Sequence, residues 1–308
     1  MMAPSRNRIT CWGDSLTEGG SKDGIFPLHQ AWPAQLEQAL GGAVQVVNRG
    51  RCGETADGVG IRCGSLEVWL RPVGGTIPAE GEVRLECAQT CDHEERRYEG
   101  SLAGVAGTLE RRGDTWFFER AEPGVPVPVG MLVPFVSGLP DSRGDVLIYS
   151  VGTNNHWANG TTVCPDRTTH VIASYQRFLN WAGHDKVLFI GLSPATTNRP
   201  GDILWQLAER LNAWLLEHHP GRFFDFRTWL REEALEAAGI TPTDDDLRAR
   251  AEGRTPQSVM DRGDDVHFTT AIHAALGRRL AVELTARGWV DGRVPDETPG
   301  HRFPPVEP

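Results

Sequence analysis

The segment Gly13-Asp14-Ser15-Leu16-Thr17-Glu18-Gly19 follows directly on a short run, Arg8-Ile9-Thr10-Cys11-Trp12. That run is β-branched and apolar between polar flanks, which predicts a buried strand. A strand that leads into Gly-Asp-Ser and a turn places the Ser15 hydroxyl at the carboxyl end of the first strand of a sheet. In open α/β sheets, reacting groups collect at that end. A surface turn uses the same residue types, so the rest of the chain has to supply partners for Ser15.

The composition of the 308 residues is that of an ordinary globular chain, with 39 % hydrophobic and 23 % charged residues. A net charge of -10, with no block of Lys and Arg, argues against a nucleic-acid partner. No apolar run approaches the length of a membrane span. The N-terminus lacks the apolar core of a secretory signal, and six scattered cysteines are not typical of a disulfide scaffold. We therefore expect a cytoplasmic protein with reduced thiols; packaging in a phage particle would also fit.

The spacing of apolar residues alternates between strand-like and helix-like segments along most of the chain. The predicted strands are 8–12, 44–47, 145–151, 187–191 and 222–226, and the predicted helices are 32–40, 55–63, 167–182, 203–218, 229–238 and 271–286. This alternation predicts an α/β fold, a three-layer α/β/α, doubly wound and mostly parallel sheet of the flavodoxin-like kind. The polar, turn-rich segment 21–30 is a candidate cover for the site, and 240–263 is expected to be a surface excursion.

Residues 64–140 interrupt this pattern with apolar residues at a period of two and frequent glycines, typical of β-hairpins. A loop of that length without internal structure is uncommon in compact domains, so the segment predicts a small all-β insertion. The predicted domains are therefore a discontinuous α/β domain at 1–63 and 141–290 and a β-rich insertion at 64–140. The Pro-rich tail at 291–308 is expected to be flexible.

Several polar groups follow strand ends that a parallel sheet brings to one edge. Ser15 follows the first predicted strand, Gly50 the second, and Asn154 the strand at 145–151. His267, with Asp264 three residues before it, precedes the last helix. A nucleophilic serine needs an imidazole to take its proton and a carboxylate to orient that imidazole. Acyl transfer also needs donors for the oxyanion, which the Ser15 and Gly50 N–H groups and the Asn154 amide can supply.

Four blocks in this order resemble the SGNH (GDSL) hydrolase family: Gly13-Asp14-Ser15-Leu16, Asn48-Arg49-Gly50, Gly152-Thr153-Asn154 and Asp264-Asp265-Val266-His267. The resemblance implies Ser15 as nucleophile, His267 as base and Asp264 as third triad member. It also implies an oxyanion hole of Ser15, Gly50 and Asn154. Asn155 departs from the pattern, because many members have Asp there. The β-rich insertion is a larger departure, similar to that of a subset tied to phage tails and polysaccharide surfaces.

The resemblance implies an esterase that hydrolyses a small acyl ester. The first candidate is an acetyl ester, either of a carbohydrate or of another small alcohol. No metal or organic cofactor is expected. Residues beside the blocks are candidates for contact with the substrate: Trp12, Asn155, His156 and Trp157.

Other interpretations of the same residues stay open. The chain could transfer the acyl group to an alcohol, or it could be a glycan-binding attachment module whose working part is the insertion. Gly50 could serve only as a turn glycine, and Asp264 could be a helix cap. Asp265 is a rival for the triad acid. Cys87, Cys91 and His93 lie close together in sequence and offer zinc-type ligands, but no second ligand pair stands out.

Overall fold

The computed structural model describes residues 7–88, 96–156 and 167–291, and it divides into two compact units. Unit 1 comprises Met1–Cys52, Arg143–Thr153 and His184–Pro308, and unit 2 comprises Gly53–Ser142 and Asn154–Gly183. The segments 53–63 and 154–183 thus group with the β-rich part, although the predicted domain limits assign them to the α/β part. The predicted limits therefore remain a prediction.

Unit 1 is built on a five-stranded parallel sheet in the order β15-β14-β13-β1-β4. The strands are β1 (Arg8–Gly13), β4 (Gln45–Gly50), β13 (Val146–Ser150), β14 (Val187–Ile190) and β15 (Phe223–Phe224). The inner strand β1 ends at Gly13, which pairs with Gly50 of β4 on one side and Ser150 of β13 on the other. This confirms the predicted parallel sheet and aligns the carboxyl ends of three strands.

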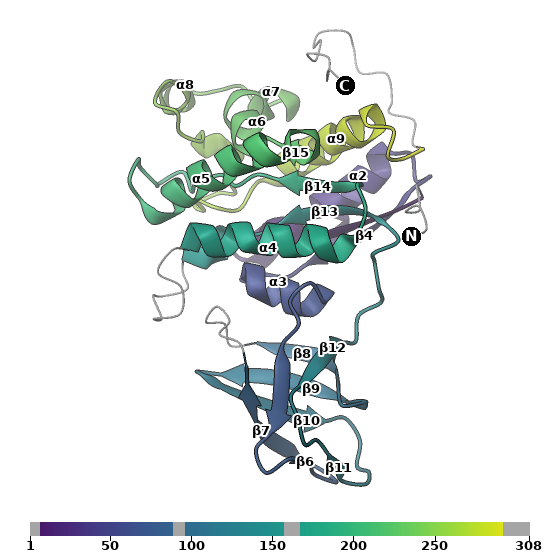
Figure 1. The fold of residues 1–308 in the computed structure, drawn as a ribbon. Helices are drawn as coiled ribbons and strands as arrows, with labels where there is room; N and C mark the ends of the chain where they lie inside the picture. The colour runs from purple at the N-terminus through teal and green to yellow at the C-terminus, as the bar shows by residue number, and fades with distance from the viewer. Residues whose placement is uncertain (1–6, 89–95, 157–166, 292–308) are drawn as a thin grey trace. The chain divides into compact units, whose positions relative to one another are not determined.

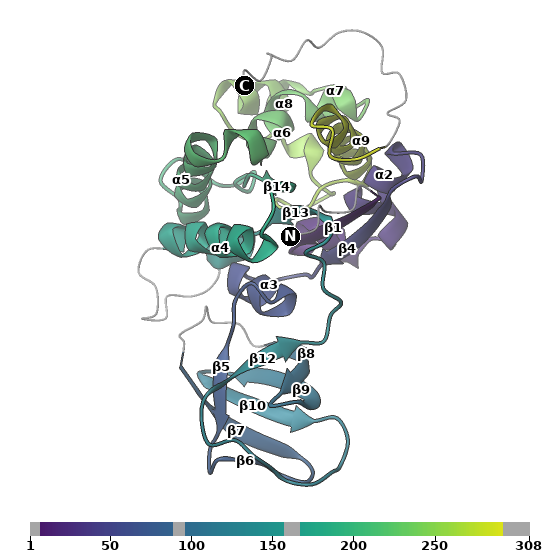
Figure 2. The same cartoon turned by 45° about the vertical axis from the view of Figure 1, so that its right-hand side comes forward.

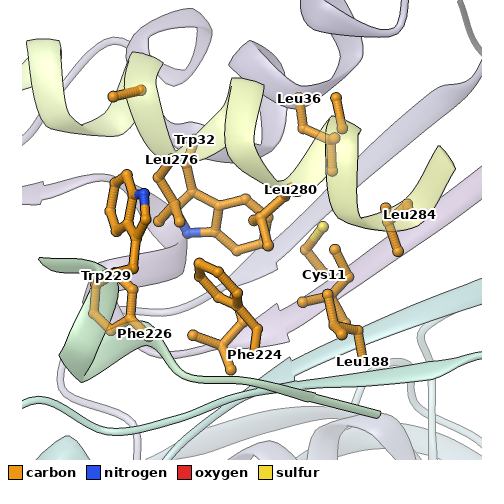
Figure 3. Packing of buried hydrophobic residues seen from close by; sticks show 14 of the residues in the cluster. Cys11, Trp32, Leu36, Leu188, Phe224, Phe226, Trp229, Leu276, Leu280 and Leu284 are labelled. Atoms are coloured by element: carbon orange, nitrogen blue, oxygen red, sulfur yellow. The ribbon is translucent and has the colours of Figure 1, made fainter. Parts of the chain in front are cut away.

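Helices cover both faces of this sheet (Figure 1). On one face, α2 (Trp32–Ala39) and α9 (Thr270–Ala286) pack with α6 (Phe226–Glu232) and α7 (Ala234–Ala237) over one apolar cluster. Figure 3 shows Leu276 and Leu280 of α9 beside Trp32 and above Phe224. The other face carries Phe189, against which His219 at the end of α5 (Ile203–His218) packs edge-on.

Two parts of unit 1 differ from the sequence-based expectation. The helix predicted at 229–238 begins earlier and is divided into α6 and α7, because Glu233 has a φ of -119°. The polar segment 240–263 contains α8 (Asp244–Ala251), whose capping box between Thr243 and Asp246 satisfies the first turn. The short elements of this unit are α1 (Ser15–Glu18), β2 (Gly20–Ser21), β3 (Gly24–Ile25) and the 3₁₀ helices η1 (Leu28–Gln30), η3 (Pro220–Arg222) and η4 (Gln257–Val259).

Unit 2 contains a closed six-stranded barrel in the order β10-β7-β5-β12-β8-β9 (Figure 2). Its strands are β5 (Trp69–Pro72), β7 (Glu82–Cys87), β8 (Arg97–Leu102), β9 (Val105–Arg112), β10 (Thr115–Arg120) and β12 (Val133–Ser137), with a small β6 (Thr76–Ile77) and β11 (Val127–Pro128) pair. The barrel has its own apolar core, which includes Leu70, Leu109 and Phe118. Closure pairs each of the six barrel strands with two neighbours, whereas an open sheet of this size would expose two edge strands.

The helices of unit 2 are α3 (Ala56–Cys63), α4 (Arg167–Ala182) and the 3₁₀ helix η2 (Thr153–His156), whose first residue falls in unit 1. Thr55 caps α3 through the Gly58 N–H, as predicted. The buried Asp57 carboxylate joins the two α-helices, because it accepts from Arg177 at 2.9 Å and lies 2.9 Å from His170 Nε2. Within the described residues, no helix is long and apolar enough to cross a membrane, and the four cysteines there form no disulfide.

Candidate active site

Ser15 follows the carboxyl end of β1, in the first turn of α1. Asp14 caps this turn by accepting from the Leu16 N–H at 3.0 Å. The turn is tight, because a Cβ at Gly13 would lie 2.1 Å from Thr17 Oγ1. Ser15 itself is 3 % exposed. Among the described residues its N–H has no hydrogen-bond acceptor, as is usual for the first N–H groups of a helix.

His267 is held by a loop that is hydrogen-bonded at both ends. The His267 carbonyl accepts from the Asp261 N–H at 2.8 Å, and the Asp264 N–H donates to the Asp261 carbonyl at 2.9 Å. The next residue, Phe268, is buried and packs edge-on against Phe226 at 5.5 Å between ring centroids. The buried Phe268 ring therefore anchors the backbone directly after His267 and so restricts the position of the His267 side chain.

The side chains of Ser15, His267 and Asp264 form one chain of hydrogen bonds within unit 1. His267 Nε2 lies 2.9 Å from Ser15 Oγ, and His267 Nδ1 lies 2.7 Å from Asp264 Oδ2. The structure thus brings together three residues that the sequence separates by 252 positions at the widest. This order of hydroxyl, imidazole and carboxylate can lower the cost of removing the serine proton.

The Asp264 carboxylate stays ionised because of its local donors. Burial raises its pKa, but hydrogen bonds from the Val266 N–H, the His267 ring and the His267 N–H outweigh burial and hold the pKa below its ordinary value. The two N–H groups reach Oδ1 at 2.8 and 3.1 Å, which leaves Oδ2 for the imidazole. A charged carboxylate at Nδ1 favours the tautomer whose Nε2 is free to accept a proton.

The rival acid, Asp265, is engaged elsewhere. Its Oδ2 accepts from Thr197 Oγ1 at 2.5 Å, and its carbonyl accepts from the Thr196 N–H at 2.9 Å. Asp265 therefore holds the loop to the segment after β14, and the carboxylate at the imidazole is that of Asp264.

Gly50 has a packing role at the end of β4. A Cβ there would lie 2.1 Å from the Glu18 backbone nitrogen, so only glycine fits. Its N–H donates to Asn48 Oδ1 at 2.9 Å and is thus occupied in this structure. The alternative that Gly50 serves the backbone alone accounts for both contacts, and its oxyanion role remains a prediction.

The third predicted oxyanion donor belongs to unit 2. Asn154 donates from Nδ2 to the Glu54 carbonyl at 3.0 Å, which uses one of its two amide hydrogens. Its neighbour Asn155 is buried, and its Oδ1 accepts from the Ala56 N–H at 3.0 Å. This bond assigns Asn155 a structural contact at the start of α3.

The other predicted substrate contacts are Trp12, His156 and Trp157. Trp12 is 1 % exposed, and this burial argues against the predicted contact with a substrate. The backbone of His156 ends η2, and nothing is described of its side chain. Trp157 lies outside the described residues, as do Cys91 and His93 of the zinc hypothesis. Among the residues with described positions, no group of three or more metal-binding side chains occurs.

Some residues at the site escaped the sequence analysis. Gly20 touches both Ser15 and His267, and the only sequence signal was the Gly19-Gly20 pair. Gln257 donates from Nε2 to the Asp264 carbonyl at 2.7 Å and accepts from Thr196 Oγ1 at 2.5 Å. Both residues act through loops that come together only in the fold, which periodicity cannot detect.

No family model and no curated protein matches the chain. Similar solved structures include a putative lipolytic protein of the G-D-S-L family from Desulfitobacterium hafniense DCB-2, at 12 % identity and a TM-score of 0.47, covering 90 % of this chain and 99 % of that one. A lipase/acylhydrolase from Enterococcus faecalis has 12 % identity and a TM-score of 0.48, covering 94 % and 99 %. A carbohydrate acetylesterase family member from Sinorhizobium meliloti has 17 % identity and a TM-score of 0.41, covering 92 % and 98 %.

Proposed function

We propose that the chain is a serine ester hydrolase that works through an acyl-serine intermediate. The observation that carries the proposal is the chain of hydrogen bonds from Ser15 Oγ through the His267 ring to Asp264 Oδ2, at 2.9 and 2.7 Å. Nucleophilic catalysis by serine requires these three groups in this order. The substrate is a small acyl ester, foremost an acetyl ester, of an alcohol or a carbohydrate, which follows from the family resemblance of the four sequence blocks.

The reaction has two halves that use the same base. His267 Nε2 takes the Ser15 proton while Oγ attacks the ester carbonyl, and a tetrahedral oxyanion forms. The imidazolium returns that proton to the leaving alkoxide, the C–O bond to the alcohol breaks, and the acyl group stays on Ser15. A water molecule then gives a proton to His267 while its oxygen attacks the acyl carbon. The bond from that carbon to Ser15 Oγ breaks, the imidazolium returns its proton to Oγ, and the acid leaves. Asp264 stays ionised throughout and stabilises the imidazolium.

The developing oxyanion needs donors that are already in place. The Ser15 N–H, which has no acceptor among the described residues, is the first of them. Asn154 is a further donor that the family resemblance of the sequence blocks implies, and the Gly50 N–H would have to leave Asn48 Oδ1 to take part. We therefore expect the Ser15 N–H to contribute more than the Gly50 N–H.

The turnover of p-nitrophenyl acetate tests this proposal. Ser15→Ala removes the nucleophile and His267→Ala the base, so each should lower kcat by about 1000-fold or more. A loss under about tenfold for His267→Ala would exclude it as the base. An acyl-chain-length series of activated esters, run beside acetylated sugars, tests the substrate class, and transfer product in the presence of an added alcohol would indicate an acyltransferase.

A further inference from the structure

A short hairpin of unit 1 lies against the proposed catalytic pair. Strands β2 and β3 pair antiparallel, with Gly20 opposite Ile25. The hairpin is attached at its base, where the Phe26 N–H donates to the Gly19 carbonyl at 2.8 Å. It is also attached to the His267 loop, because the Lys22 N–H donates to Asp261 Oδ2 at 3.3 Å.

Within the hairpin, Gly20 lies next to the side chains of Ser15 and His267. A Cβ on Gly20 would lie 2.7 Å from His267 Cδ2, 3.0 Å from His267 Nε2 and 2.9 Å from Ser15 Cβ. These distances are shorter than real Cβ contacts, so the backbone of Gly20 abuts the imidazole and the serine directly. Gly20 is not among the glycines with a positive φ. Space beside the catalytic pair, and not backbone conformation, is therefore what requires glycine here.

The strand register determines on which face of the hairpin the Ile25 side chain lies. Residues directly opposite in an antiparallel pair carry their side chains on the same face, with Cβ atoms about 5 Å apart. The face on which Gly20 would carry its Cβ is the one that meets Ser15 and His267. The register therefore puts the Ile25 side chain on the same face of the hairpin as Gly20, and Ile25 is 46 % exposed.

The chemistry of the leaving step says what Ile25 would meet. His267 Nε2 has to donate its proton to the leaving oxygen, which requires that oxygen within hydrogen-bond distance of Nε2. The hairpin borders the Nε2 side of the ring. An alcohol attached to that oxygen would therefore have the hairpin as a neighbour.

We propose that the β2–β3 hairpin is the alcohol-binding wall of the ester site, with Gly20 as a positioning residue for His267 and Ile25 as the apolar contact for the leaving alcohol. The alcohol class that fits is an aryl or alkyl alcohol larger than methanol. This proposal rests on the proposed esterase function and adds a selectivity to it.

Hydrolysis of acetyl esters that differ only in the alcohol tests the role of Ile25. For each of two esters, phenyl acetate and methyl acetate, the quotient is the kcat/KM of Ile25→Ala divided by the kcat/KM of the wild type. The intrinsic reactivity of the ester cancels in this quotient. The quotient should be about five- to tenfold lower for phenyl acetate, because the variant loses apolar contact with the ring alone. Ile203→Ala, which truncates an exposed isoleucine on α5, is the matched control with equal quotients.

The same esters separate the two levels of the proposal. If the wild type and Ile25→Ala discriminate the alcohols alike while Ser15→Ala is inactive, the esterase function stands and the wall is wrong. If Ile25→Ala instead changes selectivity for acyl length at a fixed alcohol, the hairpin borders the acyl side and the proposal is also wrong. A wild type that turns over none of the esters overturns both levels.

Gly20→Ala tests positioning. The added methyl should displace the imidazole, and a displacement near 1 Å costs on the order of 100-fold in kcat, with little change in KM. Gly144→Ala is the control, since a Cβ there meets nothing within 4 Å and its φ is not positive. If Gly20→Ala keeps wild-type kcat, or loses kcat only in proportion to a lower unfolding free energy, Gly20 does not position His267.

Discussion

The Asp264 carboxylate divides its two oxygens between separate tasks. Oδ1 accepts the N–H groups of Val266 and His267 and so shapes the loop, while Oδ2 holds the imidazole at Nδ1. Because one residue sets both the loop and the ring, the orientation of His267 depends little on flexible surroundings. The same donors keep the pKa of Asp264 below its ordinary value.

Asp264→Asn isolates the charge from the shape. Asparagine retains an oxygen for the two N–H groups, so the loop should persist, but it cannot stabilise an imidazolium. We expect kcat for p-nitrophenyl acetate to fall by about 1000- to 10,000-fold with little change in KM. Asp265→Asn is the control, because that carboxylate faces Thr197. A larger loss in the Asp265 variant would reverse the assignment.

Gly50→Ala distinguishes a packing role from an oxyanion role. The new Cβ would meet the Glu18 backbone at 2.1 Å, which only a backbone shift can relieve. Overpacking of this kind costs about 1–3 kcal/mol, so the urea midpoint should fall clearly below that of Gly221→Ala, where a Cβ meets nothing within 4 Å. An unchanged midpoint together with a large loss of kcat would instead favour the oxyanion role.

At the scale of elements, α9 carries a buried histidine that makes folding depend on pH. His273 is 1 % exposed, its Nδ1 accepts from the Trp32 N–H at 3.3 Å, and burial, aided by the nearby His267, lowers its pKa to about 4. In the unfolded chain its pKa returns to about 6.5. The unfolded state therefore binds more protons between these values, and stability is lost as pH falls from about 6.5 towards 4.

His273→Gln should flatten this dependence. The wild type should lose on the order of 2–3 kcal/mol of unfolding free energy through His273 between pH 7 and pH 4.5, in addition to what other groups contribute. Urea unfolding followed by tryptophan fluorescence at both pH values measures the difference. An equal loss in the variant and the wild type would mean that His273 is not the group responsible.

Long periodic elements were predictable, and short ones were not. The strands β1, β13 and β14 and the helices α4, α5 and α9 appear near their predicted limits, because burial on one or both faces imposes a clear period. The β2–β3 hairpin has only two residues in each strand and is held by a contact to the His267 loop. Strands this short show no alternation of apolar and polar residues from which they could be predicted. The helix α8 has little apolar character and is signalled only by its capping box.

The candidate site follows the same rule. Its three side chains could be expected to meet because strand ends converge at the sheet edge and His267 precedes a periodic helix. The occupied N–H of Gly50 could not be expected, because it depends on how the Asn48 side chain turns at the end of β4. The sequence shows which residue types are available for the site, but it does not show which atoms each of them contacts.

At the scale of the whole molecule, the described residues form separate apolar clusters, among them one on the parallel sheet and one inside the barrel. Leu280 belongs to the first and Leu109 to the second, and both are fully buried. We expect Leu109→Ala, which costs about 2–5 kcal/mol, to speed amide hydrogen exchange in the barrel strands more than in β1 and β13. Leu280→Ala should give the opposite pattern. Uniform acceleration in both variants would indicate one cooperative unit.

The central claim, that Ser15 is the activated nucleophile, is tested most directly by labelling with a fluorophosphonate probe and mapping the labelled peptide. Only a serine with an adjacent base attacks the probe readily. We predict one label, on the peptide that contains Ser15, which Ser15→Ala abolishes and Ser101→Ala in β8 leaves unchanged. Labelling that persists in Ser15→Ala, or that maps to another residue, would contradict the claim.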